Sequence, residues 1–523
     1  MGDSSYMKAQ FQAIGAEKRV VAICFFIALS QFQYGYDSAA VAGFQSMPGF
    51  LIVFGYSDPE NPIGYNISTR VQTLVQSLIQ LGSLVACIII FGYGQFFHGR
   101  IGLWIAGLAS IVSVGIMVGS KHLAALYVGR FLLGFSNGFY TTYSAIYMGE
   151  ASPSYLRGPI VGMIMFQVSF GALIGILVDN YMQTNLTPLS YQVPLAVTAV
   201  IPVVVSIGLI FLPESPRHYI MKGNESKAAT AITKLRGITD TTRIQEDIRI
   251  MKEAWIAETE ERTTTSFLDA FRGANLRRTL LSTAASVGQT ASGITFIAAF
   301  SVYFYVQANI GQPFVWVMVG LTIALTGNML SFLAIRFVPR RTLLLNSSTI
   351  NSMLMFGMAI VYTVASPASP AAGKALVALS IIFTWVYGVA QGPVLWAMQA
   401  EVPSQKLRSQ TVGLAQGINF IFAWLLTYCT PYFINPEALN WGPKYCYIWG
   451  GSNLILAVFV FFFIPETKGR SLEQLDELFE NRVATRKFAA YVTNLQQPDT
   501  DESVVKSGVE VTHVEHRRSE DKV

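Results

Sequence analysis

The sequence predicts an all-α membrane protein whose twelve spanning helices form two six-helix bundles. Of its 523 residues, 52% are apolar and only 13% are charged, about half the charged share of a soluble domain. The mean hydropathy is +0.44. The charges are also clustered, because 45 of the 67 lie in residues 1–19, 213–278 and 471–523. This composition argues against a soluble enzyme, which would need more polar surface to stay dispersed.

Twelve low-charge segments are long enough to cross a bilayer, for which about 20 apolar residues suffice. Six of them precede a charged central segment and six follow it. The predicted spans cover residues 20–44, 69–93, 101–120, 123–146, 159–182 and 193–212, and then 279–307, 314–337, 343–366, 375–399, 409–434 and 446–464.

The predicted organisation follows from these spans. It comprises a cytoplasmic N-terminal segment (1–19), a six-helix bundle (20–212), a cytoplasmic linker (213–278), a second bundle (279–470) and a cytoplasmic helix with a disordered tail (471–523). Apolar residues recur at helical spacing in 226–235, 242–255 and 471–479. These segments are predicted to be short amphipathic helices that lie against the cytoplasmic face.

The orientation follows from the basic residues of the short connections. One set of connections contains most of them, among them Arg100, Arg157 and Arg408, and the other set has only four. Basic loops stay in the cytosol, so both termini are predicted to be cytoplasmic. On this topology Asn66 (NIS) and Asn185 (NLT) face outside and are predicted glycosylation sites.

Other functional classes find little support in the sequence. The net charge of +5 includes no block of like charge, so no nucleic acid partner is expected. The five histidines lie at span ends, in loops or in the tail, and no phosphate-binding loop occurs, so neither an enzyme nor an ATP-driven pump is predicted. We expect a monomer in the lipid bilayer without a cofactor. Cys429 and Cys446 could pair in an outer loop.

Two charges of opposite sign lie deep within predicted spans. Asp37 is the only charge between Arg19 and Asp58, and Arg130 is the only one between Lys121 and Glu150. An ionised side chain near the bilayer centre costs several kcal/mol unless it faces a cavity or a partner. The two residues are therefore predicted to pair.

Such a pair can couple transport to protons. The protonation of a carboxylate in a low-dielectric site depends on whether a guanidinium is in contact with it. A conformational change that separates Asp37 from Arg130 would let the acid take or lose a proton. A static ion pair that only fixes helix packing is the alternative, although burial of such a pair is seldom justified by stability alone.

The two halves of the sequence repeat each other weakly. The loop after the fourth span reads GEASPSYLRG and the loop after the tenth reads AEVPSQKLRS, with Glu150 and Glu401 each seven residues before an arginine. The halves also end alike, in LPESPR at 212–217 and IPETKGR at 464–470. This pattern is typical of a transporter built from parallel repeats.

On these motifs the sequence resembles the sugar porter family of the major facilitator superfamily, and especially its fungal members. The resemblance covers about residues 20–480. It rests on five motifs, which are YGYD (34–37), GRFLLGFSNG (129–138), PESPR (213–217), GPVLW (392–396) and PETKG (465–469). It implies that Asp37 and Arg130 serve proton coupling. It also implies a cytoplasmic charge network that latches the outward-open state, formed by Glu150, Arg157, Glu214, Arg217, Glu401, Arg408 and Glu466.

The resemblance also implies a solute site, in which this sequence departs from the family pattern. The predicted solute-binding residues are Gln33, Gln167, Gln289, Ser292, Thr295, Trp396 and Asn419. The seventh span keeps the first glutamine of the family motif but has Thr290 and Thr295 where a second glutamine and an asparagine are usual. Met165 stands where a sugar-binding glutamine is usual, with Gln167 two residues further on. Each lost amide removes a donor and an acceptor, so a disaccharide, polyol, cyclic polyhydroxy acid or glycosylated metabolite becomes an alternative to a hexose.

The expected function is proton-coupled uptake of a sugar or related polyhydroxy solute across the plasma membrane by alternating access. A passive uniporter and a non-transporting sugar sensor remain alternatives. The tail after the last family motif is about 50 polar residues, which is short for a signalling appendage.

Overall fold

Long helices make up most of the computed structural model, which describes residues 17–59, 64–94, 97, 99–152, 157–237, 240–264, 267–307, 310–365, 369–468, 470, 472–488 and 490–491. Ten helices in this part of the chain are long and apolar enough to cross a membrane. The helices that match the first and fourth predicted spans are not among the ten, although they are 27 and 29 residues long. They contain Asp37 and Arg130.

The first six predicted spans form the N half. They correspond to α2 (Lys18–Phe44), α4 (Thr69–Tyr93), α5 (Gly99–Gly119), α6 (Leu123–Ala151), α7 (Arg157–Met182), and α8 (Leu189–Thr198) with α9 (Val200–Phe211). The sixth span begins four residues before the predicted start and is interrupted at Ala199. Pro202 explains the interruption, because a proline has no N–H to donate to the carbonyl of Thr198.

The last six predicted spans form the C half. They correspond to α13 (Gly273–Ala291) with α14 (Ile294–Gln307), α15 (Pro313–Phe337), α16 (Arg340–Val364), α17 (Pro370–Val386) with the π-helical turn η4 (Tyr387–Gln391) and α18 (Gly392–Glu401), α19 (Arg408–Ile434) and α20 (Cys446–Phe463). The seventh span begins six residues before its predicted start, inside the expected linker. It breaks at Gly293, whose φ of +86° suits a residue without a side chain.

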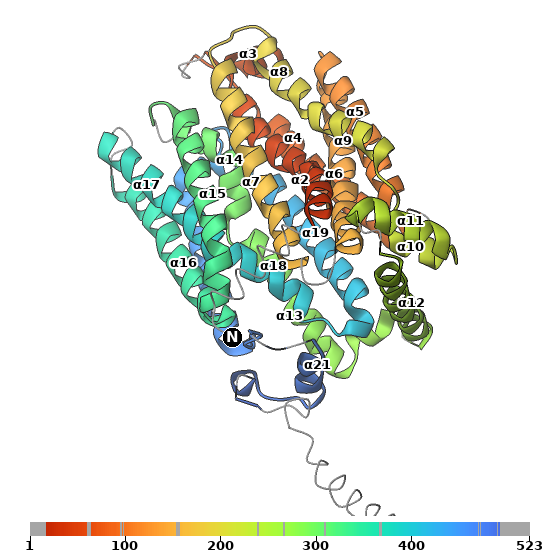
Figure 1. Ribbon diagram of the computed structural model, residues 1–523. Coiled ribbons are helices and arrows are strands. Elements are labelled where there is room, and N and C mark those ends of the chain that lie inside the picture. The colour runs from red at the N-terminus through yellow and green to blue at the C-terminus, as the bar shows by residue number, and fades with distance from the viewer. Residues whose placement is uncertain are drawn as a thin grey trace, which may run out of the picture.

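The remaining elements lie at the two ends of the bundle (Figure 1). One end contains α3 (Pro48–Phe54) and a small antiparallel pair, β1 (Tyr56–Ser57) with β2 (Tyr65–Asn66), in which Tyr56 is opposite Asn66. We call this the outer end, following the predicted topology. The cytoplasmic end contains α10 (Pro216–Met221), α11 (Glu225–Arg236), α12 (Thr241–Thr264), η3 (Phe267–Phe271), α21 (Leu472–Glu480) and η7 (Thr485–Lys487). The three predicted amphipathic helices are therefore present as α11, α12 and α21.

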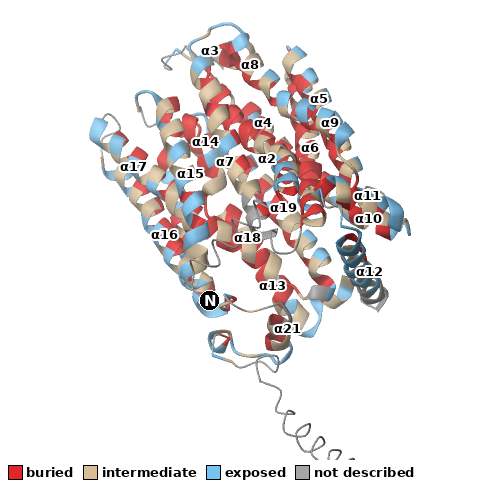
Figure 2. Ribbon diagram, in the orientation of Figure 1, coloured by how far each residue is buried: buried red, intermediate tan, exposed pale blue. Residues whose placement is uncertain are grey.

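The buried apolar residues show where the two halves pack together. At the outer end one continuous cluster joins the halves, with Phe44, Phe50 and Val71 of the N half packed in the same core as Phe300 and Trp449 of the C half. At the cytoplasmic end the N half and the C half have separate clusters. Buried residues are frequent in the middle of the bundle (Figure 2). The two halves therefore share an apolar core at the outer end, whereas their apolar cores are separate at the cytoplasmic end.

Candidate functional site

Asp37 and Arg130 are in contact in the middle of the N half. The Arg130 Nη1 donates to the Asp37 Oδ1 over 2.8 Å, and each side chain is 1% exposed. The Arg130 Nε donates to the carbonyl oxygen of Val75 in α4 at 2.9 Å. The predicted pairing is confirmed. Removing one member of such a buried pair costs about 3–5 kcal/mol, because the other charge is left uncompensated.

Two tyrosines, one from each half, lie near each other close to this ion pair. Tyr34, one helical turn before Asp37, is half-buried, and its side chain forms a hydrogen bond with Gln80 of α4. Tyr387, the first residue of the π-helical turn in the C half, lies near Tyr34. Sequence reasoning did not select these tyrosines. The signal that could have found them is their spacing, since Tyr34 begins the YGYD motif and Tyr387 precedes GPVLW by five residues.

The C half brings several predicted polar residues together. The Gln289 Nε2 donates to the Gln399 Oε1 at 3.4 Å, and the Gln399 Nε2 donates to the Gln416 Oε1 at 3.1 Å. The hydroxyl of Thr290, next to Gln289, donates to the Asn419 Oδ1 at 2.5 Å. Helices α13, α18 and α19 thus contain two hydrogen-bonded sets, one of Gln289, Gln399 and Gln416 and one of Thr290 and Asn419. Such groups can exchange their mutual hydrogen bonds for those of a solute with several hydroxyls.

Other predicted solute-binding residues are placed differently. The Ser292 hydroxyl donates to the carbonyl of Gln289 at 2.6 Å, where it stabilises the break in the seventh span. The Gln33 Nε2 donates to the Ser110 Oγ of α5 at 2.7 Å, so this side chain points into the N half. Gln167 is buried, with no hydrogen bond to either amide atom among the described residues. Thr295 and Trp396 are half-buried.

One buried acid was missed by sequence reasoning. Asp179 lies near the outer end of α7, is fully buried, and neither carboxylate oxygen has a hydrogen-bond partner in the described part of the chain. Its Oδ2 packs directly on Gly43 of α2, where an added Cβ would lie 1.9 Å away. Asp179 is three residues from the end of the predicted span 159–182, so its position in the sequence does not distinguish it from a charge at the membrane surface.

The predicted cytoplasmic charge network divides into two similar sets, and the set of the N half begins at Glu214. The Glu214 Oε1 accepts from the backbone N–H of Arg100 at 3.2 Å, at the start of α5. Glu150 forms a hydrogen bond with the Ser215 side chain and faces Arg217. The Arg157 side chain lies outside the described part of the structure.

The C half repeats this arrangement. The Glu466 carboxylate accepts from the backbone N–H groups of Arg340 and Arg341, each at 3.1 Å, at the start of α16. The Arg340 guanidinium pairs with Glu401, and the Arg408 Nε donates to the carbonyl of Ala400 at 2.8 Å. In each half, the glutamate of the PE motif therefore caps the N-terminus of the third helix. Its negative charge interacts favourably there with the helix dipole. Each of these contacts joins residues of the same half.

At the outer end, a carboxylate of the C half caps a helix of the N half. The Glu437 Oε2 accepts from the backbone N–H of Thr69 at 3.3 Å and from its hydroxyl at 3.5 Å, in the first turn of α4. The Asn435 Nδ2 donates to the same hydroxyl at 3.2 Å. Burial, together with a hydrogen bond to Glu437, raises the pKa of the nearby Tyr56 to about 12, so this hydroxyl keeps its proton. These contacts hold the outer end closed.

Glu437→Ala is expected to shift the protein toward conformations in which the outer end is open. The variant loses two hydrogen bonds and a charge at a helix N-terminus, which changes the ratio of the two conformations by about tenfold. The measurement is the maleimide labelling rate of a cysteine placed at Val71, which is buried in the outer cluster. Asp58→Ala is the matched control, because Asp58 accepts from Asn66 within the N half. Equal labelling rates with and without the Glu437 change would contradict this interpretation.

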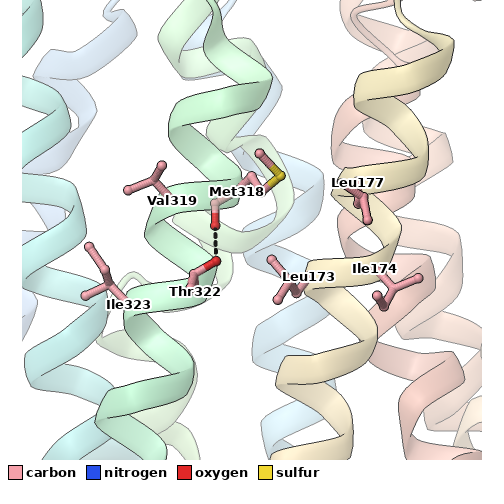
Figure 3. Close-up of a pocket in the computed structure, with 7 residues that line it drawn as sticks. All are labelled: Leu173, Ile174, Leu177, Met318, Val319, Thr322 and Ile323. Carbon is pink, nitrogen blue, oxygen red and sulfur yellow. Dashed lines mark hydrogen bonds between the residues drawn. The ribbon is translucent and has the colours of Figure 1, made fainter.

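The seam between α7 and α15 is apolar toward the outer end. An open groove of about 380 Å³ lies there, and Leu173 of α7 and Met318 of α15 point toward each other's helices (Figure 3). The Thr322 hydroxyl in this groove donates to the carbonyl of Met318 in its own helix. One turn from the groove, the Asn328 Nδ2 donates to the Ser169 Oγ across the seam at 2.6 Å. A groove with so few free polar groups does not suit a polyhydroxy solute.

The two predicted glycosylation sites differ in their surroundings. Asn66 is buried in the outer end, where its Nδ2 donates to Asp58 and its Oδ1 accepts from the backbone of Ile67. Asn185 is half-buried in an outer turn, and the two hydrogen bonds of its side chain, from the backbone and hydroxyl of Thr187, both use the Oδ1. A glycan is attached to the asparagine Nδ2. The Nδ2 of Asn185 is therefore more accessible than the Nδ2 of Asn66.

Asn185→Gln is expected to abolish the mobility shift that a glycosidase causes on a denaturing gel. Asn66→Gln serves as the comparison and should leave the shift intact. A shift that persists in Asn185→Gln and disappears in Asn66→Gln would reverse this assignment. The other predicted modification does not form, because Cys429 and Cys446 are both free thiols.

Comparison with known proteins identifies the family. Residues 23–479 match the family described as "Sugar (and other) transporter", which is most of the chain. The chain therefore belongs to this family, and the resemblance expected from its motifs is confirmed.

Its relatives include fungal transporters and a fungal sensor. The high glucose sensor RGT2 of Saccharomyces cerevisiae is 28% identical over 481 residues, covering 90% of this chain and 62% of the sensor. The chain thus spans less than two thirds of that relative's length. The general alpha-glucoside permease of the same yeast is 28% identical over 475 residues, covering 88% of this chain and 75% of the permease. The major facilitator-type transporter ecdD of Aspergillus rugulosus is 25% identical over 474 residues, covering 87% and 86%.

A solved structure with the same fold is the inward-open xylose transporter XylE from E. coli. It matches with a TM-score of 0.70 at 19% identity, over 88% of this chain and 99% of XylE. This similarity shows that the chain has the fold of the major facilitator superfamily, to which XylE belongs. Ten helices of spanning length among the described residues, together with membership of the transporter family, make the protein a multi-pass membrane protein.

Proposed function

We propose that this protein imports a sugar or related polyhydroxy solute together with protons, by alternating access. The observation that carries the proposal is the isolated, fully buried contact between Asp37 and Arg130. Family membership supports a sugar-like solute. The hydrogen-bonded amides and hydroxyls around Gln289, Thr290 and Asn419 support a solute with several hydroxyls.

In the proposed cycle, opening of the outer end lets Asp37 take a proton and release Arg130. Solute binding at the middle of the molecule, near Tyr34 and Tyr387, then permits closure of the outer end. Proton release toward the cytosol restores the ion pair. The paired state, in a structure whose halves pack together at the outer end, is consistent with the end of this sequence.

The cytoplasmic charge sets are proposed to act in the opposite conformation. When the cytoplasmic ends of the halves meet, Glu150 and Arg157 would latch against Glu401 and Arg408, which would stabilise the outward-open state. The proposal places both termini in the cytosol and the protein in the plasma membrane. The proposed energy source is the protonmotive force, and the proposed mechanism uses no cofactor.

The test is uptake of a panel of labelled sugars, polyols and quinate-like acids by cells that lack their own carriers. We expect accumulation of at least one solute above its external concentration, and loss of that accumulation when a protonophore is added. Uptake that reaches only equilibrium and ignores the protonophore would identify a passive uniporter.

A non-transporting sensor is the second candidate, because the high glucose sensor RGT2 is among the relatives. The same panel separates the two. A sensor would bind a sugar without moving it, so binding to the purified protein without uptake by cells would favour the sensor and overturn the proposed import.

A further inference from the structure

Two arginines meet at one phenylalanine on the cytoplasmic rim of the C half. The Arg341 Nη2, at the start of α16, donates to the carbonyl oxygen of Phe461 near the end of α20 at 2.6 Å. The guanidinium of Arg486, in η7 of the C-terminal segment, lies 4.7 Å from the centroid of the Phe461 ring. Three segments that are distant in sequence thus bring two positive charges to one place.

These positive charges are not neutralised within the described residues. Neither guanidinium forms an ion pair there, and the Arg341 Nε is buried without a hydrogen-bond partner. The carboxylate of Glu466, at the start of α16, accepts from the backbone N–H groups of Arg340 and Arg341. Planar guanidinium groups with unused donors are the usual ligands of phosphate oxygens in proteins.

The rim lies where a span ends and the bilayer surface begins. Phe462 and Phe463, the last two residues of α20, are each 55% exposed. At the adjacent end of α15 the Arg336 guanidinium lies 5.6 Å from the centroid of the Phe337 ring, which is also exposed. Exposed aromatic rings beside arginines at a helix end are typical of the level of the lipid headgroups.

We propose that this rim binds the headgroup of an anionic phospholipid of the cytoplasmic leaflet. Arg341 and Arg486 donate to its phosphate, and Phe462 and Phe463 lie beside its acyl chains. The lipid thereby fastens the C-terminal segment to α16 and α20. This inference does not depend on which solute the protein transports.

The internal repeat supplies a matched control. In the N half the Arg100 Nη2 donates to the carbonyl of Ile210 at 3.4 Å, which repeats the contact between Arg341 and Phe461. The C-terminal segment that supplies Arg486 lies against the C half, where Leu478 and Phe479 are part of the core. Arg100→Gln therefore removes the same type of contact without removing the proposed site.

The experiment is native mass spectrometry of the purified full chain, titrated with short-chain phosphatidylserine or phosphatidylcholine. We expect the wild-type chain to retain phosphatidylserine in preference to phosphatidylcholine. Arg486→Gln should weaken phosphatidylserine binding about fivefold, because each basic residue near an anionic headgroup contributes about that factor. Arg341→Gln combined with Arg486→Gln should weaken it further, and Arg100→Gln should not change it.

Arg486 is exposed, so Arg486→Gln is expected to fold, and an unchanged elution profile and melting temperature verify this. Equal retention of the two lipids, or unchanged binding by Arg486→Gln, would overturn the proposal. Inorganic phosphate is the further probe. If it displaced phosphatidylserine at equal concentration, the rim would be a site for free phosphate and the assignment to a lipid would be wrong.

Discussion

Asp37→Asn is expected to abolish accumulation of solute against its gradient while leaving exchange of solute across the membrane. Asparagine keeps the size of the side chain and can still accept a hydrogen bond from Arg130, but it carries no titratable proton. The variant should therefore bring the internal solute to the external concentration and no higher. Entry of protons with solute should disappear in the same variant.

The measurement is uptake into proteoliposomes with an imposed proton gradient, together with exchange of labelled for unlabelled solute. Asp179→Asn is the matched control, because Asp179 is also a fully buried carboxylate of the N half. It has no guanidinium contact among the described residues, so its replacement should leave uphill uptake in place. If Asp37→Asn still concentrates solute, the coupling role of this pair is wrong.

The fold could be predicted from the sequence because membrane helices obey a simple rule of length and polarity. The twelve spans, the three amphipathic helices and the contact between Asp37 and Arg130 all follow from where charges are rare. When two side chains of opposite charge lie in the hydrocarbon region and have no other partners, the favourable arrangement is for them to form an ion pair. Local sequence therefore determined a contact between residues 93 positions apart.

Features that depend on three-dimensional packing were not predictable in the same way. The break at Gly293 and the π-helical turn at Tyr387 do not change the hydropathy of a span, so they leave no trace in that pattern. Asp179 lies close to a predicted span end, and its burial depends on neighbours in α2 that the sequence around it does not reveal. The closed outer end depends on Glu437 in a loop, which has no periodic pattern.

The candidate solute site was predicted only in part, for a related reason. Gln289 bonds to Gln399 of the tenth span, and Asn419 of the eleventh span accepts from Thr290, the neighbour of Gln289 in the seventh span. Gln33 and Ser292 occupy the expected spans, but their side chains are committed to Ser110 and to the carbonyl of Gln289. A polar residue in a membrane helix can serve packing or a solute, and the sequence alone does not reveal which face of the helix it occupies.

Gly35→Ala is expected to reduce stability strongly, because α2 and α7 cross there with their backbones in contact. A Cβ added at Gly35 would lie 1.8 Å from the carbonyl oxygen of Val168, and one added at Gly171 would lie 2.1 Å from the carbonyl oxygen of Phe32. Neither backbone atom can move without separating the helices. Overpacking of this kind costs about 3 kcal/mol or more, which should lower the apparent melting temperature by about 5 °C or more.

The measurement is thermal unfolding of the purified protein in detergent, followed by the loss of the monodisperse elution peak. Gly115→Ala is the matched control, since Gly115 is also a helical glycine of the N half but has no atom within 4 Å of an added Cβ. Its replacement should leave the melting temperature unchanged or raise it slightly, because alanine favours helix more than glycine does. Equal melting temperatures for the two variants would mean that α2 and α7 do not approach this closely. The same crossing sets the position of Asp37, two residues further along α2, so Gly35→Ala should also impair uphill uptake whereas Gly115→Ala should not.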